Sequence, residues 1–220
     1  MDARLLKDLD PEGLPILHLY DWAGPSATYG HFIDLSKHLD LTKAADSRLA
    51  LARRPTGGGI VFHIWDLAFS FLMPAGHRAC SKNTLENYRF VNEVVLEAVQ
   101  EKAMLISEDA PSMTPECRHF CMARPTIYDV VYQGRKVAGA AQRRTRQGYL
   151  HQGTVSLAFP HLGLLKNILR SQEEITRAMA AYTFAPLGSL WRSEALVAAR
   201  CELQHLLTKK FLAKLQSLPL

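Results

Sequence analysis

Two arginines and three consecutive glycines stand together in RRPTGGGIVFH, residues 53–63. A backbone without side chains lets a ligand approach its N–H groups closely, and adjacent arginines favour a bound anion. The segment therefore indicates a cradle for a phosphate or a carboxylate, with a flexible hairpin turn as the alternative. It is not a P-loop, because no Gly-Lys-Ser/Thr follows, and it lacks the spacing of a dinucleotide-binding fingerprint.

A lysine with small neighbours occupies the segment GRKVAGAAQRRTR, residues 134–146. Lys136 follows a predicted turn and is followed by Gly139 and alanines, so its side chain can reach into a pocket. There it would neutralise a phosphate or polarise a carbonyl; the alternative is a surface lysine in a hairpin. The five positive residues from Arg135 to Arg146, with no acid among them, suit a phosphate, a nucleic acid, an acidic protein partner or a solvated face.

The elements that would position these residues are both strands and helices. Short apolar runs rich in branched and aromatic residues predict strands at residues 14–22, 27–32, 60–66, 68–74, 105–109, 127–132, 136–142 and 150–159. Apolar residues at helical spacing predict helices at residues 40–50, 83–104, 161–171, 173–184 and 193–216. Residues 109–125, with three prolines, predict a loop, and Gln133-Gly134 predicts a turn. This order predicts an α+β fold with a mostly antiparallel sheet flanked by helices.

The composition is that of an ordinary globular protein. The chain has 220 residues, 48% of them hydrophobic and 21% charged, with a net charge of +5, which favours one large domain with a substantial core. The first residues are polar, so no secretory signal is expected, and the run LAFSFLMPAG is too short to span a bilayer. The four scattered cysteines predict reduced thiols rather than a structural zinc site. We expect a cytoplasmic protein.

Taken together, three segments resemble those of a known family. RRPTGGGIVFH resembles the R-R-x-x-G-G-G-x-V-F-H signature of lipoate–protein ligase A, and GRKVAGAAQ resembles that family's G-R-K-[IV]-[AS]-G-[SN]-A segment. HQGT, residues 151–154, is similar to its H-H-G-T, and the resemblance covers residues 16–157 in matching order and spacing. It implies a biotin/lipoate ligase-like catalytic domain with a helical C-terminal tail. The chain lacks the G-R-G-R-x-G-R loop of the biotin ligases. We expect residues 1–220 to form this single domain, without the separate C-terminal accessory domain of longer ligases.

The resemblance implies a pocket for an acyl-adenylate. Carried over by position, Lys136 would be the catalytic residue that contacts the acyl carbonyl and the phosphate. Asp129 aligns with an acidic residue that would bind magnesium at the phosphate. The residues implied in acyl-adenylate binding are Arg53, Arg54, Gly57, Gly58, Gly59, Ile60, Val61, Phe62, His63, Gly139, His151 and Gly153. The implied substrates and cofactors are lipoate or octanoate, ATP and Mg²⁺.

Departures from the ligase pattern point to a related enzyme. Tyr128 stands where the ligases have asparagine, and Gln152 stands where they often have histidine. CMARPTIYD, which begins at Cys121, resembles C-F-x-A-P-[ST]-x-Y-[ED] of the cysteine-dependent octanoyltransferases of the same superfamily. In those enzymes the cysteine takes the acyl group from a carrier thioester without ATP. Against this, the transferases commonly show G-G-R-A-V-L-H where this chain has GGGIVFH, and a loop thiol without a role is a further alternative for Cys121.

We therefore expect an enzyme that attaches lipoate or octanoate in amide linkage to a lysine of a lipoyl-bearing domain. The first candidate is an ATP-using lipoate–protein ligase, and the second is a Cys121 octanoyltransferase that uses octanoyl carrier protein. The expected partners are lipoyl domains of 2-oxoacid dehydrogenase complexes or the glycine cleavage H protein. A candidate from another class is a non-catalytic nucleic-acid-binding protein that uses residues 135–146, for which few aromatic partners are present. We expect neither a nucleic-acid partner nor a membrane partner.

Overall fold

The computed structural model describes residues 1–99, 103–109 and 115–218. A six-stranded sheet has the order β1-β5-β9-β8-β7-β6, and all of its neighbouring strands are antiparallel. A three-stranded sheet has the order β3-β2-β4, parallel between β2 and β3 and antiparallel between β2 and β4. The predicted α+β class with a mostly antiparallel sheet is confirmed.

The elements follow the chain in a mixed order. The strands are β1 (Ile16–Leu19), β2 (Ser26–Tyr29), β3 (Ala50–Arg53), β4 (Ile60–His63), β5 (Asp66–Pro74), β6 (Met104–Leu105), β7 (Val130–Tyr132), β8 (Arg135–Arg144) and β9 (Gly148–Ser156). The helices are α1 (Asp2–Lys7), α2 (Leu41–Asp46), α3 (Thr84–Val99), α4 (Leu162–Ile168), α5 (Gln172–Tyr182) and α6 (Ser193–Gln216). Short 3₁₀ turns span Leu35–Lys37, Glu116–His119 and Cys121–Ala123.

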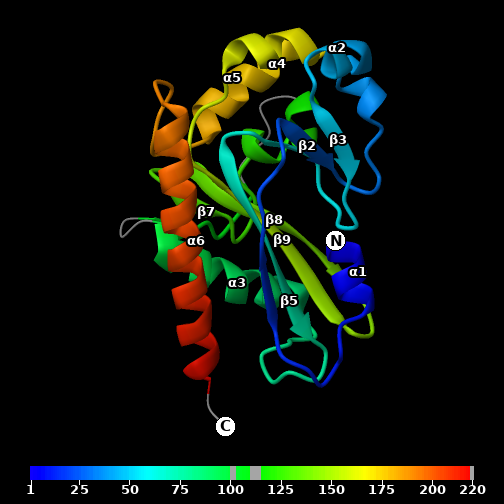
Figure 1. The fold of residues 1–220 in the computed structure, drawn as a ribbon, viewed down its shortest axis with the longest axis vertical. Helices are drawn as coiled ribbons and strands as arrows, with labels where there is room; N and C mark the ends of the chain where they lie inside the picture. The colour runs from blue at the N-terminus through cyan, green and yellow to red at the C-terminus, as the bar shows by residue number, and fades with distance from the viewer. Residues whose placement is uncertain (100–102, 110–114, 219–220) are drawn as a thin grey trace.

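Helices cover the sheets in two groups. Helices α3 and α6 pack against each other and contact the large sheet, whereas α2, α4 and α5 gather at one end of the molecule beside the small sheet (Figure 1). Phe211 of α6 stacks on Phe71 of β5 with ring centroids 4.6 Å apart. None of the described helices combines the length and the apolar character needed to cross a membrane.

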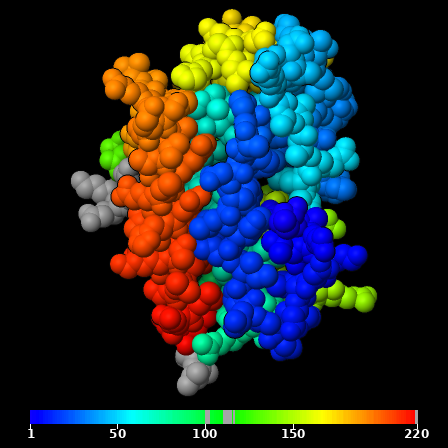
Figure 2. All heavy atoms as spheres, viewed as in Figure 1, coloured from blue at the N-terminus to red at the C-terminus, as the bar shows by residue number. Residues whose placement is uncertain are grey.

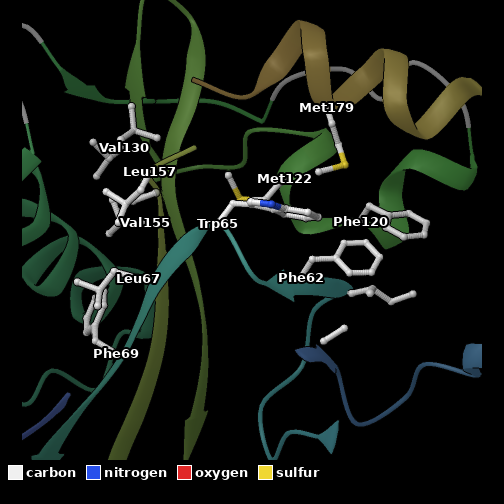
Figure 3. Packing of buried hydrophobic residues seen from close by; sticks show 14 of the residues in the cluster. Phe62, Trp65, Leu67, Phe69, Phe120, Met122, Val130, Val155, Leu157 and Met179 are labelled. Carbon is white, nitrogen blue, oxygen red and sulfur yellow. The ribbon is translucent and has the colours of Figure 1, made fainter. Parts of the chain in front are cut away.

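The apolar core is continuous between the two sheets. Phe62 of β4 stacks on Phe120, with ring centroids 6.4 Å apart, and Trp65 lies beside Met122 (Figure 3). Residues of β5 and β9 extend the same cluster under the large sheet (Figure 3). The segment around Cys121 is therefore anchored by buried aromatic side chains on one side.

Several predicted elements were wrong in extent. The helix predicted over residues 83–104 is one of them, because Met104 lies in β6. The helix predicted over residues 40–50 begins as expected, with the Asp40 side chain accepting from the Lys43 N–H, but it ends at Asp46. Arg48 has φ of 53°, which a right-handed helix cannot continue, and residues 50–53 form β3 instead. The strand predicted over residues 105–109 is limited to β6, because its partner β7 begins only after Tyr128, which has φ of 65°.

The turn predicted at Gln133-Gly134 is confirmed. Gln133 has φ of 51° and Gly134 has φ of 72°. Two consecutive positive φ angles are the mark of a type I′ hairpin turn, whose twist matches that of the flanking strands. The turn joins β7 to β8 and so places Lys136 at the beginning of a buried strand.

Candidate active site

A cavity of about 660 Å³ lies between the small sheet and strands β8 and β9. Figure 2 shows the corresponding hollow on the viewed face, bounded by α1, the blue segment before β2 and the cyan segment around β3. Of the residues named from the sequence, the lining contains Arg53, Arg54, Gly58, Gly59, Val61, His63, Cys121, Lys136, Gly139 and Gly153. Two motifs that lie far apart in the chain therefore share one cavity.

The glycine turn is held by hydrogen bonds from Arg54 to its backbone. The Arg54 side chain is buried, and its Nη2 donates to the carbonyls of Gly57 at 2.9 Å and Gly59 at 2.8 Å. Gly58 has φ of +81°, a conformation that favours glycine. A Cβ on Gly59 would collide with the His119 carbonyl oxygen. The glycines thus let this turn approach the backbone of the segment that carries Cys121.

Cys121 occupies the wall of the cavity at the start of a 3₁₀ turn. Its half-buried Sγ lies 3.8 Å from Arg54 Nη2, which donates to it. The next residue is fixed, because the Thr183 hydroxyl donates to the Met122 carbonyl at 2.6 Å. A sulfur beside a positive charge, exposed to a cavity and held by a rigid backbone, is in the environment of a nucleophilic cysteine.

Lys136 and Asp129 form a buried ion pair. Lys136 Nζ lies 2.6 Å from Asp129 Oδ2, and both side chains are 4% exposed. The same carboxylate oxygen accepts from the Thr126 N–H at 2.6 Å and from its hydroxyl at 2.8 Å. A Cβ on Gly139 would lie 2.5 Å from Lys136 Nζ and 2.7 Å from Asp129 Oδ1. Glycine at this position therefore leaves the space in which the two charges meet.

A series of buried hydrogen bonds holds the Arg54 side chain in place. Arg54 Nη1 donates to the Thr28 hydroxyl at 3.1 Å, and Thr28 is 2.8 Å from His63 Nε2. His63 Nδ1 lies 2.7 Å from Asp66 Oδ2, which fits the tautomer with its proton on Nδ1. Trp22 stacks on the His63 ring at 4.6 Å. His63 thus positions other groups of the wall.

Several residues predicted for the pocket lie outside its lining. His151 faces the opposite side of β9, where its Nδ1 bonds to Gln142 Nε2 at 2.8 Å. Complete burial lowers the pKa of His151 to about 3, so the ring is neutral. Ile60 and Phe62 pack towards Phe120 instead, and Gly57 is also outside the lining. His151 is therefore separated from the Cys121 sulfur by the sheet.

The sequence-based reasoning missed the N-terminal part of the site. Asp2 of α1 lines the cavity, and its carboxylate bonds to His18 Nδ1 at 2.8 Å, to the Ser70 hydroxyl at 2.5 Å and to Gln152 Nε2 at 2.6 Å. Tyr20 also lines it, and burial raises the pKa of its hydroxyl. The available signal was Gln152, the departure within the HQGT segment, but its bond to Asp2 spans 150 residues.

The predicted magnesium ligand does not by itself make a metal site. Asp129 Oδ2 is already bonded to Lys136 and Thr126. In the described part of the chain, no group of three or more histidine, cysteine, aspartate or glutamate side chains could hold a metal ion. Magnesium is commonly held by one or two carboxylates together with substrate phosphates, so the magnesium role of Asp129 stays a prediction.

Comparisons with known proteins concern the family and the fold of this chain. Residues 1–189 match the family model described as the lipoyl protein ligase A/B catalytic domain. The octanoyltransferase LipM of Geobacillus kaustophilus (strain HTA426) is 30% identical over 166 residues, which cover 71% of this chain and 59% of that relative. The structure of a lipoate-protein ligase A bound with ATP has 20% identity and a TM-score of 0.73, covering 98% of this chain and 78% of that chain. A bi-partite lipoate protein ligase from Thermoplasma acidophilum, described with its E2 lipoyl domain, has 20% identity and a TM-score of 0.70, covering 98% of this chain and 76% of that chain.

Proposed function

The chain belongs to the lipoyl protein ligase A/B catalytic-domain family, and from this premise we propose that it transfers an octanoyl group from a carrier thioester to a lipoyl-domain lysine through Cys121. This proposal places the second sequence-based candidate ahead of the first. The observation that carries it is the position of Cys121 in the cavity wall that it shares with Lys136, with Arg54 beside its sulfur. Similarity to proteins named octanoyltransferases supports the same order.

In the first half of the reaction, the acyl group moves onto the enzyme. The Cys121 sulfur attacks the carbonyl carbon of the octanoyl thioester, and a new carbon–sulfur bond forms. The bond to the carrier sulfur breaks, and the proton lost by Cys121 passes to the departing carrier thiol. Exchange between two thioesters is nearly balanced in energy, so no nucleotide is needed.

In the second half, the lysine of the lipoyl domain takes the acyl group. Its neutral amine attacks the Cys121 thioester carbonyl, the carbon–sulfur bond breaks, and one amine proton passes to the sulfur. The carbonyl oxygen carries negative charge in both tetrahedral intermediates. The Lys136 ammonium, fixed by Asp129, would stabilise that charge because it is already oriented in a site with little water.

The cavity also offers space for the acyl chain. Val61, Ala140 and Ala141 contribute apolar wall near Gly139 and the cysteine. An octanoyl chain buries apolar surface there, which favours binding by about 25 cal/mol for each Å² removed from water. Small residues on β8 keep this wall open.

An ATP-using ligase is the second candidate. The 660 Å³ cavity is large enough for a nucleotide-linked acyl group by the usual range of ligand sites, and GGGIVFH has the ligase form. The acid and ATP would give acyl-adenylate and pyrophosphate, after which the target lysine would displace AMP. Lys136 would then contact both the carbonyl and the phosphate.

The wider setting of the reaction is part of the proposal. We propose lipoyl domains of 2-oxoacid dehydrogenase complexes or the glycine cleavage H protein as acceptors, in the cytoplasm. Residues 1–220 would act as a single catalytic domain. Because the chain spans 59% of the length of the Geobacillus kaustophilus relative, its sufficiency for both half-reactions is itself a proposal, which assays on residues 1–220 address.

A donor comparison tests the proposal. Purified protein is incubated with apo lipoyl domain and either octanoyl carrier protein without nucleotide or lipoate with ATP and Mg²⁺. Mass spectrometry of the lipoyl domain measures amide formation. We expect modification with octanoyl carrier protein alone; modification only in the presence of ATP would instead support the ligase.

A further inference from the structure

Two basic segments, Arg53-Arg54 before the glycine turn and residues 135–146, meet at the mouth of the cavity. Arg143, near the end of β8, is exposed, and its Nη1 donates to the Pro55 carbonyl at 3.3 Å. Pro55 and Arg53 both line the cavity. The basic stretch of residues 135–146, of whose positive residues the acyl-transfer chemistry uses only Lys136, is therefore tied to the glycine turn at the entrance by Arg143.

Three exposed arginines at this entrance form no ion pair within the described part of the chain. Arg53 and Arg118 are exposed and line the cavity, and Arg53 packs over the Tyr29 ring at 5.6 Å. Among the residues that the structure describes, no carboxylate forms an ion pair with Arg53, Arg118 or Arg143. Inside the cavity, by contrast, the charge of Lys136 is balanced by Asp129.

We propose that this arginine rim, formed by Arg53, Arg118 and Arg143, is the docking surface for an acidic carrier protein whose prosthetic arm bears a phosphodiester. The inference rests on the proposed function. A carrier's thioester lies at one end of the arm and the phosphodiester at the other. When the thioester reaches Cys121 in the cavity wall, the phosphodiester lies towards the mouth, where arginine guanidiniums bind phosphate oxygens well.

The rim also suits the acidic surface of such a carrier. Unpaired exposed charges around an entrance raise the rate of encounter with a partner of opposite sign, and this effect weakens as salt is added. Asp21 is an exposed carboxylate in the lining, where the exposed Arg53 and Arg118 outnumber it. Nucleic acid would meet the same charges, but it brings no thioester to Cys121.

Charge reversal at one rim position tests the proposal. The variant is Arg143→Glu, and Lys209→Glu is the matched control, because Lys209 is exposed on α6 and lies outside the cavity lining. Intact mass spectrometry measures the rate of octanoyl adduct formation on the full chain, at several concentrations of two donors. Octanoyl carrier protein has the acidic surface and the phosphodiester, whereas octanoyl-pantetheine has neither.

We expect Arg143→Glu to raise the half-saturating concentration of octanoyl carrier protein about tenfold and to reduce its salt dependence. The rate with octanoyl-pantetheine should not change, and Lys209→Glu should behave as wild type with both donors. The docking surface would be overturned if Arg143→Glu and Lys209→Glu raised the half-saturating concentration of octanoyl carrier protein equally. It would also be overturned if Arg143→Glu lost as much activity with octanoyl-pantetheine as with octanoyl carrier protein. An adduct on the wild-type protein with either donor keeps the proposed function in place even then; no adduct with any donor would count against the function itself.

Discussion

At the scale of single residues, the site depends on two charges that are held without solvent. Lys136 and Asp129 are each 4% exposed, and a buried charge is stable only when it is paired and hydrogen-bonded. Thr126 supplies two further hydrogen bonds to the carboxylate. The pair therefore gives the lysine a fixed position, which is the condition for stabilising a developing oxyanion.

Replacing the lysine should remove this contribution. We expect Lys136→Ala to lower the rate of amide formation about 100- to 1000-fold, the usual cost of losing one oriented charge. It should also destabilise the fold by about 3–5 kcal/mol, because Asp129 is left buried without its partner. Rates are measured on protein shown to be folded by circular dichroism, with the exposed Lys209→Ala as control. Near-normal turnover by folded Lys136→Ala would refute the assignment.

Gly139, which leaves space for the Lys136–Asp129 ion pair, allows a test of the position of the lysine. In Gly139→Ala the new Cβ would collide with Lys136 Cε, so the lysine must move out of its position. We expect a loss of at least about tenfold in rate and a destabilisation of about 1–3 kcal/mol from overpacking. Gly163→Ala in α4 is the matched control, since a Cβ there meets nothing within 4 Å. It should keep full activity, and equal losses in both variants would contradict the explanation.

At the scale of elements, the glycine turn and the cysteine segment form one unit. Ile60 of β4 pairs with Phe120 in a parallel bridge, and Arg54 reaches from the turn to Cys121 Sγ. The position of the cysteine therefore depends on how closely two backbones approach. Gly59 permits that approach, whereas Gly57 lies beside open space.

Two alanine variants separate these glycines. Gly59→Ala should lower the free energy of unfolding by about 1–3 kcal/mol, because its Cβ would collide with the His119 carbonyl. In a protein of this size that corresponds to a fall in Tm of about 3–10 °C. Gly57→Ala should leave Tm and transfer rate close to wild type. Calorimetry on both proteins checks this, and equal tolerance at the two positions would mean that the turn is not packed as described.

The sequence predicted those features that depend on local pattern. The start of the helix at residue 40, the Gln133-Gly134 turn and the strands on either side of that turn follow from residue types over a few positions. The family resemblance predicted that residues 53–63 and residues 134–142 line one pocket. The role of Asp2 could not be predicted, because its three partners are brought together only by the large sheet. His151 was misplaced because alternation along β9 turns it away from the face that Gln152 shares with the cavity.

At the scale of the whole molecule, a buried histidine couples the fold to pH. The pKa of His151 falls from its ordinary value of 6.5 to about 3 in the folded protein. Below about pH 6.5 the unfolded chain therefore binds a proton that the folded protein does not, so stability decreases as the pH falls towards 3. The slope from this one group is at most about 1.4 kcal/mol per pH unit. Urea unfolding of His151→Gln should show that the free energy of unfolding declines less steeply between pH 6.5 and 4 than in the wild type. If the two pH profiles were the same, a group other than His151 would be responsible for the decline.

The central claim concerns the whole reaction path, in which the acyl group rests on Cys121 before it reaches the target lysine. Intact mass spectrometry of the wild-type protein and of Cys121→Ser, each incubated with octanoyl carrier protein without ATP, tests it most directly. Serine keeps the shape but is a much poorer nucleophile. We expect one octanoyl adduct on the wild type, discharged by adding apo lipoyl domain, and neither adduct nor transfer with Cys121→Ser. ATP-dependent modification of the lipoyl domain that survives in Cys121→Ser, with no adduct on the wild type, would contradict the claim.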